Sequence, residues 1–266
     1  MSASHGRLVL VRHGQSEWNR ANLFTGWVDV DLSEKGIVEA REAGKLLRQE
    51  DIQVDVCYTS QLRRAIRTSC LLLSSINQCW VTIHKRAGLN EQHSGGLCGN
   101  NKRQLAELHG VERVMSWRRS FDDPPPPQCT DSSLYKLIDD ARYSPIGGAR
   151  VPVPTGESFR DCCERVRDFF EHELRPTLAS GQTVLVCSHG NTLRALVMLL
   201  DQISEADISQ VHASMTDPRM RPPRFQSQPQ PQPRPTPTLS PLPGRSSDGG
   251  AARVRPDERP RAGRRA

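Results

Sequence analysis

Short apolar runs alternate with longer amphipathic segments along the N-terminal three quarters of the chain. Residues 8–11 and 183–187 are continuous apolar runs rich in β-branched side chains, which is typical of strands buried on both faces of a parallel sheet. Residues 54–58 and 80–83 predict two further short strands.

Between these strands, apolar residues recur at the three-to-four-residue spacing of helices. Residues 33–50, 62–76 and 157–174 show this pattern, and a further helix is expected after residue 191, running through residue 200. Strands that alternate with helices predict an α/β fold, with a mostly parallel sheet and helices on both of its faces.

The chain divides into two parts of different composition. Residues 1–211 carry the α/β pattern and are predicted to form one domain, with a loop-rich cap insertion over about 91–156 that has helical stretches between 102 and 119. Residues 212–266 hold 12 of the 20 prolines, and 11 arginines against 4 acidic residues. A segment so rich in proline and arginine cannot build a packed core, so we expect a disordered Pro/Arg-rich C-terminal tail.

Charge and cysteine content exclude several classes of protein. Residues 212–266 carry a formal charge of +7 and residues 1–211 a formal charge of −1, which together give the +6 of the whole chain. The charge of residues 1–211 therefore gives no reason to expect nucleic acid or a membrane as a partner. No apolar stretch is long enough to span a bilayer, and the N-terminus lacks the apolar core of a signal peptide. The 8 cysteines lack the paired spacing of a zinc site, so we expect reduced thiols, no metal and a cytoplasmic location.

Two histidines follow two of the predicted strands. His13 follows the first strand and His189 the last, and each precedes a glycine, Gly14 or Gly190. Because the carboxyl ends of parallel strands meet at one edge of a sheet, both imidazoles are expected to face the same crevice. A single histidine at a strand end is more often structural, but a neutral imidazole is also a nucleophile that can carry a phosphoryl group.

Cations near these histidines favour a phosphate ligand. Arg12 precedes His13, and Arg63 and Arg64 stand at the predicted start of a helix, where free backbone N–H groups also attract phosphate. Phosphoryl transfer requires mainly positioning and positive charge around the transferred group. Helical geometry alone does not decide which of the two adjacent arginines faces the crevice and which is solvated.

A series of motifs extends this pattern along the chain: RHGQSEWN (12–19), FTGWVDVDLSEKG (24–36), YTSQLRRA (58–65), LNEQHSGGLCGNNK (89–102), WRRSFDDPPPP (117–127), PTGES (154–158) and SHGNTLRAL (188–196). In this order, over about residues 6–208, they resemble the cofactor-dependent phosphoglycerate mutases of the histidine phosphatase superfamily. The resemblance implies a phosphoglycerate mutase-like α/β fold and a glycolytic isomerase that interconverts 3-phosphoglycerate and 2-phosphoglycerate through a phosphohistidine. It also implies 2,3-bisphosphoglycerate as the priming phosphoryl donor and no metal, and it leaves a homodimer open.

The resemblance assigns roles residue by residue. Catalytic roles fall on His13, which becomes the phosphohistidine, on His189 beside it, on Arg12 and Arg64 at the phosphoryl group, and on Glu91 as general acid and base. Substrate contacts fall on Gly14, Gln15, Ser16, Asn19, Thr25, Gly26, Gln92, His93, Ser94, Lys102, Arg118, Arg119, Gly190 and Asn191. Among these, the cations of the cap are expected to hold the carboxylate and the second phosphate.

Three residues depart from the family pattern. Gln15 stands where the family usually has Glu, and Gln92 and Ser94 stand where it usually has Arg and Tyr. Losing a cation and a phenol is expected to weaken substrate binding, or to shift the balance toward hydrolysis. Family members also continue past the position of residue 208 with a further strand, whose loss is expected to expose a sheet edge.

Three other functions stay open. Bisphosphoglycerate mutase is a close relative, although Ser16 and the TGW at 25–27 favour the isomerase. A phosphatase of the same superfamily would use the same histidine. Outside the enzymes, a non-catalytic protein could act through its Pro/Arg-rich tail on SH3-like or anionic partners.

Overall fold

The computed structural model describes residues 6–144 and 149–208, so the predicted tail over 212–266 lies outside the described residues. These residues form a four-stranded sheet in the order β1-β4-β2-β3, in which every pair is parallel. Its strands are β1 (Arg7–Arg12), β2 (Val56–Thr59), β3 (Ile83–Lys85) and β4 (Thr183–Ser188). The predicted parallel α/β sheet is therefore confirmed, and within the described residues β1 forms one of its edges.

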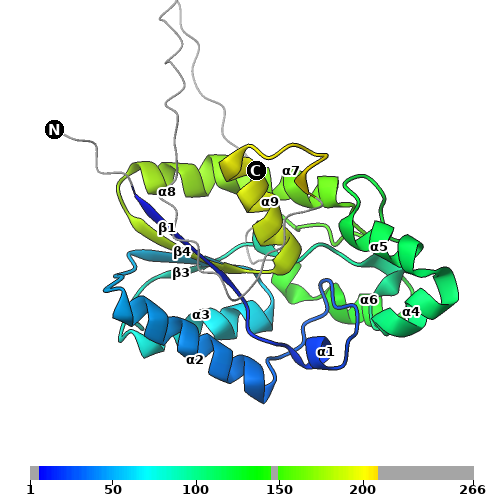
Figure 1. Ribbon diagram of the computed structural model, residues 1–266, viewed down its shortest axis with the longest axis horizontal. Helices are drawn as coiled ribbons and strands as arrows, with labels where there is room; N and C mark the ends of the chain where they lie inside the picture. The colour runs from blue at the N-terminus through cyan, green and yellow to red at the C-terminus, as the bar shows by residue number, and fades with distance from the viewer. Residues whose placement is uncertain (1–5, 145–148, 209–266) are drawn as a thin grey trace, which may run out of the picture. The chain divides into compact units, whose positions relative to one another are not determined.

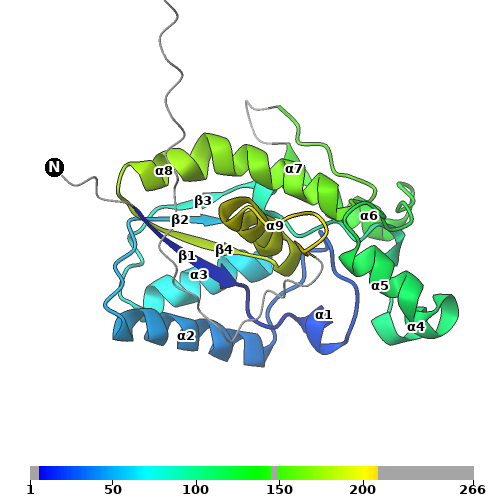
Figure 2. The ribbon, with the colours of Figure 1, turned by 45° about the horizontal axis from the view of Figure 1, so that its top comes forward.

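Helices cover both faces of this sheet, as predicted (Figures 1 and 2). One face packs against α2 (Glu34–Gln49) and α3 (Arg63–Ser75), through a core that includes Leu47 and Leu72. The other face packs against three helices, α7 (Phe159–Phe169), α8 (Arg175–Ala179) and α9 (Gly190–Asp201). The core on that side gathers aromatic and aliphatic residues such as Phe159, Phe169 and Leu196.

The remaining short elements lie beyond the carboxyl ends of the strands (Figure 1). They are α1 (Glu17–Arg20), α4 (Lys102–His109), α5 (Val111–Arg119) and α6 (Ser133–Ile138), with 3-10 turns at Ala87–Leu89, Gly95–Leu97 and Ala141–Tyr143. The helical stretches expected between residues 102 and 119 are confirmed as α4 and α5. Backbone bonds from Gly96 N–H to Pro126 O (2.7 Å) and from Gln128 N–H to Thr155 O (2.7 Å) tie the proline run into this region.

Two glycines bring the start of α2 against the loop that follows β1. A Cβ atom on Gly14 would lie 2.2 Å from the carbonyl oxygen of Gly36, and one on Gly36 would lie 2.0 Å from that of Gln15. Neither distance is tolerable, so both positions require glycine. Ser33 caps α2 by accepting the Gly36 N–H (3.2 Å) and donates to Gln15 O (3.1 Å), which fixes the loop that carries His13.

Two predicted boundaries are wrong. The strand expected at 80–83 starts only at Ile83, because Trp80 is 74% exposed and the chain pairs with β2 through Ile83–Lys85. The helix expected to end at Leu174 continues instead through a π-helical turn at Phe170–Leu174 into α8. Pro176 has no N–H to donate and lies directly after this π-helical turn, at the start of α8, so the change of helical pattern coincides with the proline.

Among the described residues, no helix is both long and apolar enough to cross a membrane. Within the same part of the chain, no group of three His, Cys, Asp or Glu side chains is arranged to hold a metal ion.

Candidate active site

The two histidines lie side by side beyond the ends of neighbouring strands. His13 follows β1 and His189 follows β4, whose ends pair Arg12 with Ser188. Their ring centroids are 4.9 Å apart, and both side chains are buried. The two strand ends therefore bring the two imidazoles together, as expected.

Hydrogen bonding fixes the tautomer of His13. Its Nδ1 lies 2.7 Å from the carbonyl oxygen of Gly14, which can only accept, so Nδ1 carries the proton and donates it. The lone pair then belongs to Nε2. Burial, followed by the charges of Arg64 and Arg12, holds the pKa of His13 well below its ordinary value of 6.5. At neutral pH, Nε2 is therefore an uncharged nucleophile.

His189 has a different partner. Its Nε2 lies 2.8 Å from the hydroxyl oxygen of Ser60, which also accepts the Leu62 N–H (3.1 Å). A hydroxyl offers one donor and two acceptor sites, so the Ser60 contact is compatible with either tautomer of His189. The Nδ1 atom is buried and has no hydrogen-bond partner among the described residues. Burial, then Arg64 and His13, keeps the pKa of His189 well below 6.5.

The structure separates the two adjacent arginines of α3. Arg64 is 1% exposed and donates from Nη1 to Val28 O and from Nη2 to Gly26 O, both at 2.9 Å. Burial lowers its pKa to about 10, so it remains charged at neutral pH. Arg63 turns outward, with a side chain 57% exposed and an ion pair to Asp29. Arg64 is the arginine that faces the histidines.

Backbone donors hold the carboxylate of Glu91. Its Oε1 accepts the N–H groups of Gln92 (3.0 Å) and Asn191 (3.1 Å), so the side chain points toward the start of α9. Its carbonyl oxygen accepts the Trp27 indole N–H (2.6 Å) and an Arg165 N–H (3.2 Å). The side chain and main chain of Glu91 are therefore fixed from both sides.

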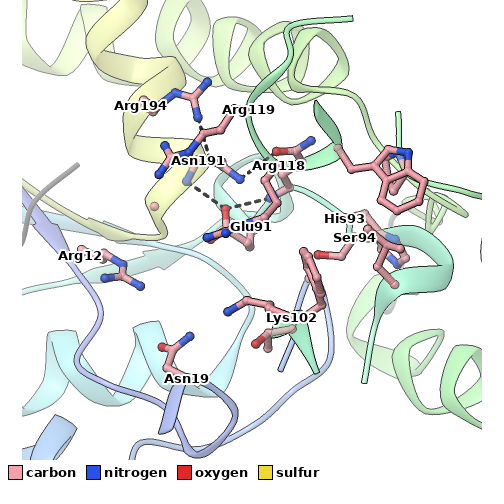
Figure 3. A pocket seen from close by; sticks show the side chains of 18 of the residues that line it. Arg12, Asn19, Glu91, His93, Ser94, Lys102, Arg118, Arg119, Asn191 and Arg194 are labelled. Atoms are coloured by element: carbon pink, nitrogen blue, oxygen red, sulfur yellow. Dashed lines mark hydrogen bonds between the residues drawn. The ribbon is translucent and has the colours of Figure 1, made fainter. Parts of the chain in front are cut away.

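Cationic side chains gather around Glu91 from four different elements (Figure 3). Arg12 comes from β1, Lys102 from α4, Arg118 and Arg119 from α5, and Arg194 from α9. Burial, together with Arg118 and Arg12, lowers the pKa of Lys102 to about 8. Burial and the neighbouring Arg119 likewise lower the pKa of Arg118. Cations that lower one another's pKa in this way repel one another, so the site favours an anionic ligand.

These side chains line a cavity of about 260 Å³, close to the lower end of the range for small-molecule sites. Of the predicted residues, the cavity wall contains Arg12, His13, Asn19, Thr25, Gly26, Arg64, Glu91, Gln92, His93, Ser94, Lys102, Arg118, Arg119, Gly190 and Asn191. The wall does not include Gly14, Gln15, Ser16 or His189. Gly14, Gln15 and Ser16 shape the His13 loop instead: for example, Ser16 caps α1 and Gln15 bonds to Ser33.

Comparisons with known proteins identify the family of this chain. The family model "Histidine phosphatase superfamily (branch 1)" matches residues 8–142 and 143–218. The chain belongs to the histidine phosphatase superfamily. Among curated relatives, the 2,3-bisphosphoglycerate-dependent phosphoglycerate mutase of Corynebacterium diphtheriae is 46% identical over 78% of this chain and 82% of its own length. The enzyme of the same name from Leifsonia xyli subsp. xyli is 47% identical over 80% of this chain and 83% of its own length.

Solved structures show the same fold. The phosphoglycerate mutase from Bacillus anthracis matches with a TM-score of 0.53 and 23% identity, over 76% of this chain and 83% of that one. A protein described as mycobacterial hydrolase 1 matches with a TM-score of 0.58 and 24% identity, over 77% and 84%. The predicted phosphoglycerate mutase-like fold is therefore confirmed.

The cavity wall also contains residues that the sequence alone did not single out. Phe24, Leu97, Trp117, Pro125 and Arg194 line the cavity as well. Arg194 lies within the motif SHGNTLRAL, one helical turn after Asn191, so its spacing could have indicated that the two side chains share one face of α9. Glu157 and Arg165 lie behind the wall, and only the fold shows that they support the Glu91 loop.

Proposed function

We propose that the chain is a 2,3-bisphosphoglycerate-dependent phosphoglycerate mutase, which interconverts 3-phosphoglycerate and 2-phosphoglycerate through phosphorylated His13. Relatives that carry this name are 42–47% identical to it over about four fifths of the chain. The observation that carries the proposal is the hydrogen bond from His13 Nδ1 to Gly14 O, which leaves Nε2 as a neutral nucleophile inside a ring of cations.

In this proposal His13 accepts the phosphoryl group at Nε2. A P–N bond forms as the P–O bond to the donor breaks, and the Nδ1–H bond to Gly14 stabilises the positive charge that develops on the ring. Arg12 and Arg64 balance the charge of the equatorial oxygens. His189 lies beside the same group, and its buried Nδ1 has no hydrogen-bond partner among the described residues.

Glu91 transfers the proton in the return step. When a substrate hydroxyl takes the phosphoryl group from His13, its proton must leave, and the Glu91 carboxylate lines the cavity where that hydroxyl would lie. The two backbone N–H groups on Oε1 hold the carboxylate in place. When phosphoryl transfer runs in the other direction, the same group returns the proton.

The residues present fit a doubly phosphorylated priming cofactor. Arg12 Nε and Thr25 Oγ1 are buried polar atoms of the cavity wall with no partner among the described residues, and Lys102, Arg118 and Arg119 add charge at the far side. When bound, 2,3-bisphosphoglycerate supplies the phosphoryl group that primes His13.

A glycolytic role, a cytoplasmic location, a homodimer and the boundary between residues 1–211 and the tail stay predictions.

A coupled assay tests this proposal. Purified protein should convert 3-phosphoglycerate to 2-phosphoglycerate in the presence of catalytic 2,3-bisphosphoglycerate, and His13→Asn should abolish the conversion. Mass spectrometry under conditions that preserve acid-labile adducts should find one phosphoryl group on His13. A folded protein that forms 2-phosphoglycerate without phosphorylation of His13 would refute the mechanism.

A phosphatase of the same superfamily is the second candidate, and Gln92 and Ser94 favour it. They replace the cation and the phenol that the mutase pattern predicts. The amide of Gln92 carries no charge, and it already donates to the carbonyl oxygen of Glu157 and accepts from Asn191. Radiolabelled bisphosphoglycerate discriminates the two functions, because a phosphatase releases inorganic phosphate and never forms 2-phosphoglycerate from 3-phosphoglycerate.

A further inference from the structure

Arg194 is a buried cation whose role the proposed function does not use. It lies on α9, is 1% exposed and lines the same cavity as Glu91. Its guanidinium stacks 4.0 Å from the centroid of the Phe159 ring, and Nη1 donates to Asn191 Oδ1 (3.1 Å). Within residues 6–144 and 149–208 no carboxylate forms an ion pair with it, although the charge of Glu91 acts on it at longer range, and its Nε and Nη2 atoms have no hydrogen-bond partner.

Such an arrangement is unfavourable in the free protein. A buried charge without a counter-ion loses its hydration and gains little in return, and donors left without acceptors add to the cost. Burial, then the charge of Arg119, lowers the pKa of Arg194 to about 10. An anion that enters the cavity would supply both the missing counter-charge and the missing acceptors.

A chain of hydrogen bonds holds Arg194 in this position. The carbonyl oxygen of Glu157 can only accept, so the amide nitrogen of Gln92 must face it (2.8 Å). Gln92 Oε1 then accepts from Asn191 Nδ2 (2.8 Å), which turns Asn191 Oδ1 toward Arg194. An arginine at position 92, which the family pattern predicts, has no acceptor atom and could not take the place of Gln92 in this chain.

We propose that Arg194 binds the acidic group of the substrate that lies farthest from His13, and that Gln92 and Asn191 are positioning residues for it. The inference rests on the proposed function and adds Arg194 to the residues that bind its substrate, a small phosphate ester with a second acidic group. Figure 3 shows Arg194 beside Arg119 and Asn191, on the side of Glu91 away from Lys102.

Calorimetric titration with two probes tests the proposal. Inorganic phosphate needs only the His13 end of the cavity, whereas 3-phosphoglycerate needs both ends. Arg194→Met should weaken binding of 3-phosphoglycerate by about 10- to 100-fold, the usual effect of losing a charge-assisted hydrogen bond, and leave binding of inorganic phosphate unchanged. Arg175→Met is the matched control, since Arg175 also stacks on an aromatic ring, that of Phe170, but does not line the cavity.

The outcomes separate ligand binding from a structural role. Equal affinity of Arg194→Met and wild type for 3-phosphoglycerate overturns the inference alone, as does an equal loss of affinity for both probes. A wild type that binds inorganic phosphate but not 3-phosphoglycerate refutes the proposed function and the inference with it.

A second variant covers the case in which Arg194→Met does not fold. Arg194→Lys replaces a cation whose pKa is about 10 by a lysine, whose pKa at the same buried position is expected to be lower. Its affinity for 3-phosphoglycerate should fall more steeply than that of wild type between about pH 7 and pH 9.5, because a buried lysine loses its proton in this range. Lys102 titrates in both proteins and cancels in the comparison. Parallel curves would overturn the inference.

Discussion

Glu157→Gln removes one charge from a buried ion pair and keeps the size of the side chain. Glu157 and Arg165 meet through two hydrogen bonds of 2.8 Å, and their side chains are only 7% and 17% exposed. Removing one partner of such a pair leaves an uncompensated buried charge, at a cost of about 3–5 kcal/mol. This is a large fraction of the roughly 5–15 kcal/mol that separates a folded domain from its unfolded state.

The same change should also disturb the Glu91 loop. Arg165 donates to the carbonyl oxygens of Gly88 and Asn90 (both 2.9 Å) as well as to that of Glu91, and Glu157 Oε2 accepts the His93 N–H (2.8 Å). Weakening this support moves the Glu91 carboxylate, and a shift of about 1 Å in the position of a catalytic group is enough to lower the rate of reaction. We therefore expect kcat to fall by roughly 10- to 100-fold, with a smaller change in KM.

Urea denaturation and steady-state kinetics measure the two effects. Glu173→Gln is the control, because Glu173 pairs with Arg86 at 2.7 Å in a half-exposed position, where such a pair contributes at most about 1 kcal/mol. If Glu157→Gln and Glu173→Gln lower the free energy of unfolding equally, or if kcat is unchanged, the reasoning fails.

Three further predictions concern the same region. Burial keeps His13, His189 and His93 neutral in the folded state, with the pKa of His93 lowered to about 4. In the unfolded chain these histidines become protonated below pH 6.5, which favours unfolding. The free energy of unfolding measured with urea should therefore be smaller at pH 5.5 than at pH 7.5, by about 1.4 kcal/mol per histidine. A pH-independent value would contradict this. Ser60→Ala removes the partner of His189 and should lower kcat by about tenfold in the coupled assay, whereas Ser60→Thr should not. Gly36→Ala forces its new Cβ against a carbonyl oxygen and should destabilise the fold by about 1–3 kcal/mol, so an unchanged melting temperature would contradict the close approach.

The elements that hold the two histidines could be predicted because their signals are local. The runs before His13 and His189 are apolar without interruption, which in an α/β chain identifies buried parallel strands whose carboxyl ends form the site. The family motifs then placed most of the cavity wall, including Glu91 and Lys102. Strand β3 was misplaced because three residues paired at an edge carry little periodicity.

Other features depend on contacts between distant segments. The choice between Arg63 and Arg64 follows from the carbonyl groups of Gly26 and Val28, which no helical pattern reveals. The tautomer of His13 depends on a hydrogen bond to a backbone carbonyl, and the role of Arg165 depends on three carbonyl oxygens of one loop. Charge patterns along a sequence cannot distinguish such a buried arginine from a solvated one.

One electrostatic environment accounts for both the nucleophile and the binding of substrate. Burial and the charges of Arg12 and Arg64 lower the pKa of His13, so its lone pair is free before any ligand binds. Among the described residues these cations have few counter-ions, so they destabilise the free protein, and a bound anion would offset this cost. Ligand binding should therefore raise the melting temperature as well as permit reaction, by an amount that grows with ligand concentration. If His13→Asn keeps this stabilisation by 3-phosphoglycerate while losing turnover, the cations bind the substrate and the imidazole performs the chemistry.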